Sequence, residues 1–254
     1  MAEAVDRDAL VAYLDGYLEA GAWSDKSLNG LQVEGAERVR RVALATDTAL
    51  ATIALAADAG AQMLIAHHGL FWGRVEPVVG PLRARLGALF DAGLSLYVSH
   101  LPLDAHPEVG NNAVLARLLE LEDREPFGRW GDRSIGVRGR LRERVDRAAL
   151  AARLEALLGA RPDVLPFGDD EIRSVAVVSG AAADLVPEAA DAGVDAFITG
   201  ETSHTAYHQA RERRVNVMFA GHYATETLGV RALGDHLTER FGLEAVFLDA
   251  PTGY

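Results

Sequence analysis

The sequence predicts an α/β fold with mostly parallel sheets, arranged as two halves. Short apolar segments alternate with stretches of helical periodicity, first near the amino terminus and again in the second half of the chain. The apolar segments cover residues 42–47, 63–68, 95–100, 175–178, 194–200 and 215–221. Strands that alternate with helices in this way are typical of right-handed βαβ units, which build parallel sheets.

The first series of elements begins after an amphipathic helix expected over residues 6–20, where apolar residues recur at helical spacing. Residues 23–35 are rich in turn formers, which indicates an ordinary surface loop that ends in a strand. Helices are expected over 50–59 and 81–92. Residues 101–107 contain two prolines and predict a loop. Asn111 or Asn112 is expected to cap a helix that continues to Leu121.

The second series is separated from the first by residues 122–134, which are charged and aperiodic and therefore predict a linker. We place the first α/β half at 1–124 and the second at 125–254. The remaining elements follow from apolar runs and periodicity. They are strands at 134–141 and 245–248 and helices at 146–158, 184–192, 203–214 and 225–241.

Composition limits the classes of function. The 254 residues are 49% apolar, enough to bury a sizeable core, and include no cysteine, which excludes disulfides and thiolate metal sites. The net charge of −12 disfavours nucleic acid and anionic membranes as partners. The acidic amino-terminal segment does not resemble a signal peptide, and no apolar run approaches the ~20 residues that span a bilayer. We expect a soluble, cytoplasmic protein.

Potential ligands for a metal gather where predicted strands end. His67 and His68 close one apolar segment, and Asp47 and His100 close its neighbours. Because chemistry in parallel sheets collects at the carboxyl ends of strands, this placement indicates a site. Taken alone, a pair such as His67-His68 is more often a pair of ordinary hydrogen-bonded polar residues at the edge of a core.

Two further clusters strengthen the prediction of a metal site. Asp104 lies between His100 and His106, and His222 and Glu226 are four residues apart at the start of a predicted helix, where they can project to one side. Glu226 could also simply stabilise the helix amino terminus. Together with His67 and His68, the residues Asp104, His222 and Glu226 complete a set of five nitrogen and oxygen ligands. That set is enough for two ions that share a carboxylate.

Several other residues are weaker candidates. Glu201 and His204, with His208 on the same helix face, lie at another strand-to-helix junction and fit either an acid/base role or a solvated helix start. His100 could orient a ligand or protonate a leaving group. Gly180 fits an anion site or a tight turn. His236, among core leucines, is expected to be structural.

Six segments carry a family resemblance. In chain order they are 30–33, 65–72, 99–107, 178–180, 199–201 and 221–226. They resemble the GTP cyclohydrolase I type 2 / NGG-one-interacting-factor-three-like family, in particular its short bacterial members. The chain departs from many members at His68-Gly69, where they carry His-Pro, and at 101–103, where they are more polar. Substrate therefore cannot be transferred from longer relatives.

The resemblance implies a three-layer α/β/α architecture and a ring-shaped homo-hexamer. It also implies a dinuclear site between the two halves, with Asp104 as the expected bridge. The implied ligands are His67, His68, Asp104, His222 and Glu226. The expected cofactors are two divalent metal ions per subunit, drawn from Zn, Fe, Mn, Ni and Co.

Two functions are compatible with such a site. The first is a metal-dependent, cyclohydrolase-like hydrolase that acts on a nucleotide or related small molecule through a water bridging the two metals. In that case His100, His204 and Glu201 would move protons. The alternative is a non-catalytic hexameric scaffold that binds metal or a metabolite. Neither function requires a membrane or nucleic acid partner.

Overall fold

The computed structural model describes residues 3–253, which divide into two compact units. The first unit holds the chain up to Leu103 and again Gly229–Ala250, and the second holds Asp104–Leu228. This division differs from the one we expected at 124/125. The segment expected to be a linker pairs into the second unit's sheet, whereas the final strand pairs into the first unit's sheet.

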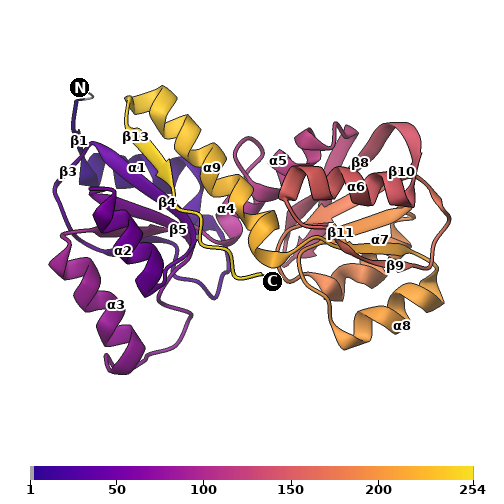
Figure 1. The fold of residues 1–254 in the computed structure, drawn as a ribbon, viewed down its shortest axis with the longest axis horizontal. Coiled ribbons are helices and arrows are strands. Elements are labelled where there is room, and N and C mark those ends of the chain that lie inside the picture. The colour runs from indigo at the N-terminus through magenta and orange to yellow at the C-terminus, as the bar shows by residue number, and fades with distance from the viewer. Residues whose placement is uncertain (1–2, 254) are drawn as a thin grey trace. The chain divides into compact units, whose positions relative to one another are not determined.

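The first unit is built on a five-stranded sheet of order β13-β4-β5-β6-β2 (Figure 1). All neighbours are parallel except β2, which pairs antiparallel with β6. The strands are β2 (Gly30–Val33), β4 (Arg41–Asp47), β5 (Met63–His68), β6 (Ser95–Val98) and β13 (Glu244–Phe247). The two-residue strands β1 (Val5–Asp6) and β3 (Arg38–Val39) pair separately.

Helices cover both faces of this first sheet, because every central strand is apolar on both sides. One face packs Ala43 and Leu64 against Ile53 of α2 (Leu50–Asp58) and Leu89 of α3 (Gly80–Asp91). The other face lies against α1 (Arg7–Tyr17) and α9 (His222–Phe241). A Cβ added to Gly234 of α9 would overlap Leu44. The short 3-10 helix η1 (Ala20–Ala22) follows α1.

The second unit is built on a six-stranded mixed sheet of order β7-β8-β10-β11-β12-β9. Strands β10, β11 and β12 are parallel, and the outer strands are antiparallel to their neighbours. The strands are β7 (Glu122–Trp130), β8 (Arg133–Asp146), β9 (Asp163–Pro166), β10 (Glu171–Val178), β11 (Ala196–Thr199) and β12 (Asn216–Phe219).

Alternation along β10 separates the two faces of the second sheet. Val175 and Val177 pack with Leu150 and Leu154 of α6 (Arg147–Leu158). Figure 1 shows α6 on one side of the sheet and α7 and α8 on the other. The remaining helices are α4 (Leu101–Ala105), α5 (Asn111–Leu118), η2 (Ala183–Leu185), α7 (Val186–Asp191) and α8 (His204–Arg213). Each unit is thus an α/β structure of three layers, which confirms the predicted class.

Three local expectations were wrong. Residues 101–105 form α4, since Pro102 lies in the first turn, where its missing N–H costs no helical hydrogen bond. Gly110, and neither asparagine, is the amino-terminal cap of α5; Asn111 and Asn112 lie inside the helix and are buried. The predicted linker is the hairpin of β7 and β8, whose charged side chains face solvent.

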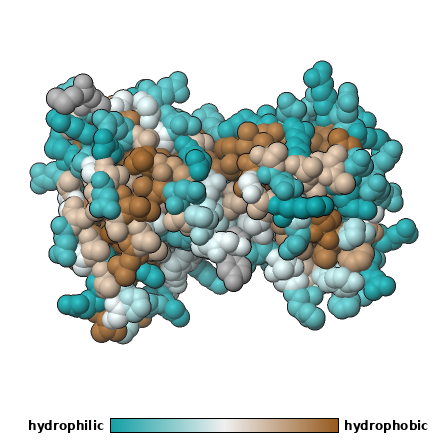
Figure 2. All heavy atoms as spheres, in the orientation of Figure 1, coloured by the Kyte–Doolittle hydropathy of each residue, from teal (hydrophilic) through white to brown (hydrophobic). Residues whose placement is uncertain are grey.

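None of the helices among residues 3–253 combines the length and the apolar character needed to cross a membrane. Figure 2 shows a mostly hydrophilic face with apolar patches, one of them over α2 and α3 of the first unit. Large apolar side chains that are exposed on or beside these helices include Leu50, Val79 and Phe90.

Candidate metal centre

In the first unit, two histidines end the buried strand β5. The preceding residues Leu64 to Ala66 are fully buried, and parallel pairing with β4 and β6 fixes the register of the strand. Ala66 pairs with Val98, and His68 pairs with Asp47. The sheet therefore carries both imidazoles to its carboxyl edge, where the sequence predicted them.

Hydrogen bonds set the orientation of both imidazoles. The Nδ1 atom of His67 lies 2.9 Å from the carbonyl oxygen of Ser99, and Nδ1 of His68 lies 2.8 Å from Oδ1 of Asp47. Because a carbonyl and a carboxylate only accept, each Nδ1 carries a proton, and in the neutral ring Nε2 carries the lone pair. Histidine ligands of metals are commonly held by such outer partners.

His100 lies beside this pair. Its ring centroid is 5.0 Å from that of His67 and 5.6 Å from that of His68. One nitrogen from each of the three rings can be chosen so that all lie within 4.8 Å of one another. The structure therefore brings together three imidazoles within the first unit, and His100 lies next to the predicted metal ligands His67 and His68.

Two residues that our sequence analysis did not single out also contact His100. Trp72 approaches it edge to face, with centroids 5.1 Å apart. The carboxylate of Asp25, whose side chain is 2% exposed, accepts from His100 Nδ1 at 3.0 Å. Burial alone would raise the pKa of Asp25, but the hydrogen bond and charge of His100 and the donors Asn29 and Ser27 lower it to about 2. Asp25 is thus held ionised.

In the second unit, Asp104 is buried on α4, at 6% exposure. The Asn111 amide donates to its Oδ1 at 2.9 Å and the Ser179 hydroxyl donates to the same atom at 2.7 Å. Two donors on one oxygen fix the rotation of the carboxylate. The asparagine that we expected to cap a helix therefore serves to hold a predicted ligand.

His222 and Glu226 share the first turns of α9, as their spacing predicted. His222 Nε2 and Glu226 Oε2 are 2.9 Å apart, and His222 Nδ1 lies 2.7 Å from Oε1 of Glu201. Burial alone would lower the pKa of His222, but the hydrogen bonds and charges of Glu226 and Glu201 raise it to about 9. These carboxylates stabilise a positive charge at this position, as a cation site requires.

A glycine makes room for Glu226. Gly180 follows β10 with φ of +65°, and a Cβ added there would overlap Oε1 of Glu226. The backbone N–H of Gly180 donates to the Thr225 hydroxyl at 3.1 Å, so the turn packs directly against the start of α9. The tight turn that the sequence left open is thus also a cradle for a predicted ligand.

The donors fit a divalent metal. Both units present imidazole nitrogens or carboxylate oxygens that are buried or half-buried and held by hydrogen bonds. The chain has no cysteine, so the donor set is that of borderline ions such as Zn, Fe, Mn, Ni and Co. His/Asp/Glu groups able to hold a metal ion therefore occur at the residues that the sequence identified.

The other candidates have different surroundings. His204 and His208 lie on the exposed face of α8 and contact each other edge to face. His106 Nδ1 accepts from backbone N–H groups of its own loop. His236 bonds Tyr13 at 2.6 Å and stacks on Tyr17, in the structural role that the sequence predicted.

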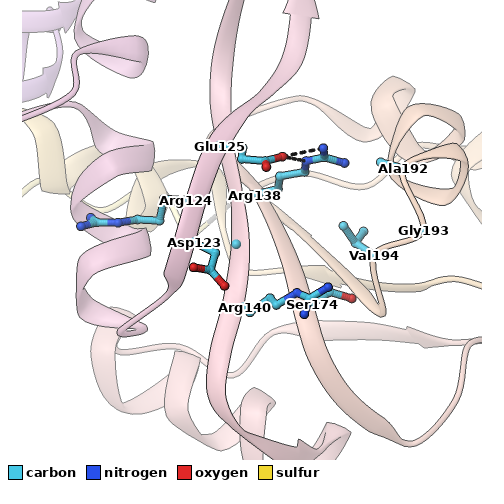
Figure 3. Close-up of a pocket in the computed structure, with 10 residues that line it drawn as sticks. Asp123, Arg124, Glu125, Arg138, Arg140, Ser174, Ala192, Gly193 and Val194 are labelled. Carbon is cyan, nitrogen blue, oxygen red and sulfur yellow. Dashed lines mark hydrogen bonds and ion pairs between the residues drawn. The ribbon is translucent and has the colours of Figure 1, made fainter.

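A separate hollow of about 660 Å³ lies in the second unit (Figure 3). Arg138 pairs with Glu125 at its wall, at 2.6 Å, and Arg140 lies beside Ser174. The hollow is lined by Val194, at the amino end of β11, whereas Gly200 and Glu201 follow the carboxyl end of that strand. It therefore lies away from the donor residues.

Comparison with known proteins identifies the family of this chain. A model of the Duf34/NIF3 (NGG1p interacting factor 3) family matches residues 5–252. The chain belongs to this family. A protein of Deinococcus radiodurans named GTP cyclohydrolase 1 type 2 homolog is 47% identical over 249 residues, with 98% of this chain and 95% of the relative covered. A Pyrococcus abyssi protein of the same name is 48% identical, with 98% and 100% covered.

Solved structures agree with the Duf34/NIF3 assignment. TTHA1606 from Thermus thermophilus is 48% identical, with a TM-score of 0.92 and coverage of 98% of this chain and 100% of that chain. The protein ybgI, described as of unknown function, is 38% identical, with the same TM-score and coverage. The resemblance predicted from sequence is confirmed, and the Duf34/NIF3 fold extends over nearly the whole chain.

Proposed function

We propose that this Duf34/NIF3 protein is a metal-dependent hydrolase that acts on a nucleotide or a related small molecule. Two divalent ions would be held by the five predicted ligands. These are His67 and His68 of the first unit and Asp104, His222 and Glu226 of the second. Bound divalent cations supply Lewis acidity and lower the pKa of water.

The observation that carries this proposal is the preparation of the donors in both units. His67 and His68 each have Nδ1 fixed by an acceptor, and Asp104 has one oxygen fixed by two donors. Fixing these side chains by hydrogen bonds costs conformational entropy. Ordinary polar residues at a solvated strand end do not need to be fixed in this way, whereas metal ligands commonly are. That the two donor sets serve one centre, with Asp104 as the bridge, is part of the proposal and draws on the family resemblance.

Proton transfer is assigned to His100. Its Nε2 would accept a proton from the attacking water, so that one O–H bond breaks as an N–H bond forms. The imidazolium would then release that proton to the leaving group. Glu201, which accepts from His222, is better suited to orient that ligand, and exposed His204 is the weakest of the three candidates.

A ring-shaped homo-hexamer is the proposed assembly. The exposed apolar side chains of α2 and α3 favour self-association, because isolated subunits rarely keep large apolar groups in a patch. Light scattering coupled to size-exclusion chromatography measures the number of subunits directly. A monomeric mass at micromolar concentration would contradict this assembly without affecting the metal proposal.

The central test is metal analysis followed by a turnover screen. Protein purified without chelator should carry about two divalent ions per chain and hydrolyse at least one nucleotide or cyclic nucleotide analogue, and His68→Ala and Glu226→Ala should abolish both. Metal retained without turnover of any compound would overturn the hydrolase. The same result would favour the alternative, a scaffold that binds metal or a metabolite. Absence of metal would overturn the hydrolase and a metal-binding scaffold alike.

A further inference from the structure

The loop between η1 and β2 brings a buried carboxylate to His100. Asp25 Oδ1 accepts from the Ser27 backbone N–H at 3.0 Å, and Oδ2 accepts from the Asn29 amide at 3.0 Å and the Leu101 backbone N–H at 3.1 Å. His100 Nδ1 lies 3.0 and 3.1 Å from the two oxygens. Every group around this carboxylate can donate. The arrangement therefore suits an ionised Asp25.

This arrangement determines which nitrogen of His100 carries the proton. An ionised carboxylate cannot donate, so His100 Nδ1 must do so, and in the neutral ring the lone pair then lies on Nε2, on the other side of the ring. Asn29 Oδ1 also accepts from the His100 backbone N–H at 2.8 Å. The loop thus holds both the main chain and the side chain of His100.

We propose that Asp25 is a positioning residue, which keeps His100 in its Nδ1–H tautomer so that Nε2 can accept a proton during hydrolysis. The chemical role rests on the proposed function, whereas the tautomer does not. The relation resembles that between the aspartate and the histidine of a catalytic triad, where replacing the aspartate by asparagine gives the wrong tautomer. Asp47, at the end of β4, likewise accepts from Nδ1 of His68, at the end of the neighbouring strand β5.

A purely structural role for Asp25 makes a different prediction. Its bonds to Ser27 and Asn29 lie within one short loop and would stabilise the turn with any ring at position 100. In that case replacing the carboxylate would lower stability and leave the His100 tautomer unchanged. The tautomer of the His100 imidazole therefore distinguishes the positioning role from the structural role.

Magic-angle-spinning NMR of zinc-reconstituted protein labelled with ¹⁵N-histidine measures the tautomer, because protonated and unprotonated ring nitrogens have distinct shifts. Spectra are recorded above pH ~8, well above the ordinary histidine pKa of ~6.5. The His100 signals are assigned by their loss in His100→Gln. We expect Nδ1–H in the wild type and Nε2–H in Asp25→Asn, since the new amide can donate to Nδ1.

Controls keep the result interpretable. Asp15→Asn makes the same change at another carboxylate of this unit, one that accepts from Tyr97, and should leave the His100 signals unchanged. Asp25→Glu keeps the charge and should keep Nδ1–H. A wild-type ring protonated on Nε2, or an unchanged tautomer in Asp25→Asn, would overturn the proposal even if Asp25→Glu failed to fold.

Kinetics distinguish this proposal from the proposed function. If a substrate is found, Asp25→Asn should lower kcat by more than ~100-fold with little change in KM, as expected for loss of proton transfer. A rise in KM alone would contradict the assigned role. If no compound is turned over, the hydrolase fails, and the tautomer measurement still decides whether Asp25 positions His100.

Discussion

In the first unit three imidazoles lie at the ends of β5 and β6, whereas in the second unit a single imidazole lies between two carboxylates. Both sets follow parallel strands, but their electrostatics differ. The histidines of the first set are oriented by acceptors at Nδ1, and His222 lies where Glu226 and Glu201 stabilise a cation. The comparison teaches that one kind of βα scaffold can prepare a metal site through geometry or through charge.

The largest effect is expected from removing a donor in either unit. His68→Ala and Glu226→Ala should each lower zinc affinity by more than the ~100-fold that loss of an outer partner can cost. If the two sets serve one centre, either variant should reduce the content of both ions; independent sets would each lose one. Elemental analysis after dialysis measures the content, and exposed His208→Ala should retain it.

The role of charge and space in the second unit can be tested at Gly180. Gly180→Ala should lower zinc affinity at least ten-fold, because the new methyl overlaps Glu226, and should also cost ~1–2 kcal/mol for the left-handed backbone. Gly193→Ala is the matched control, with φ of +68° and no atom within 4 Å of the added Cβ. It should lose stability only. Equal zinc affinity in the two variants would exclude the cradle.

A smaller effect is expected from the outer carboxylates. Asp47→Asn and Glu201→Gln replace the carboxylates that accept from His68 and His222 by neutral amides and should each weaken zinc binding about ten-fold, the lower end of the usual range. The modest size follows from exposure, because the two side chains are 38% and 46% exposed and water can replace them. Chelator competition measures the affinities. An unchanged affinity in Asp47→Asn would show that geometry at His68 does not depend on this bond.

How far the sequence predicted these features depends on the range of the interactions. The alternation of strands and helices and the pair at His222 and Glu226 are local patterns, and they were predicted. Asp25 contacts His100 from 75 positions away, and no local pattern distinguishes it from an ordinary loop aspartate. Strand β7 was missed because its charged residues lack the alternation that marks a strand, whereas the strand predicted at 134–141 lies within β8.

The two units also solve one structural problem differently. Gln62, just before β5, accepts from the backbone N–H groups of Arg40 and Arg41, both at 3.0 Å. Asp195 stands just before β11 and accepts from the backbone N–H groups at the start of β10, at 2.9 and 2.7 Å. The side-chain amide of Gln62 and the carboxylate of Asp195 therefore accept from equivalent backbone N–H groups, at the start of the neighbouring strand in each unit.

This last difference predicts that the contact made by Asp195 depends on pH, whereas the contact made by Gln62 does not. Burial alone would raise the pKa of Asp195, but hydrogen bonds from Ser174 and Arg173 outweigh it and lower the pKa. A lowered folded pKa gives stability that is present above the ordinary aspartate pKa of ~3.9 and is lost as pH falls through the folded value. Urea unfolding should thus show an Asp195→Asn penalty that is nearly constant from neutral pH down to about pH 5 and shrinks as the pH falls below the ordinary aspartate pKa of ~3.9, and a Gln62→Ala penalty that stays constant. A pH-independent Asp195→Asn penalty would mean that the carboxylate's charge contributes nothing.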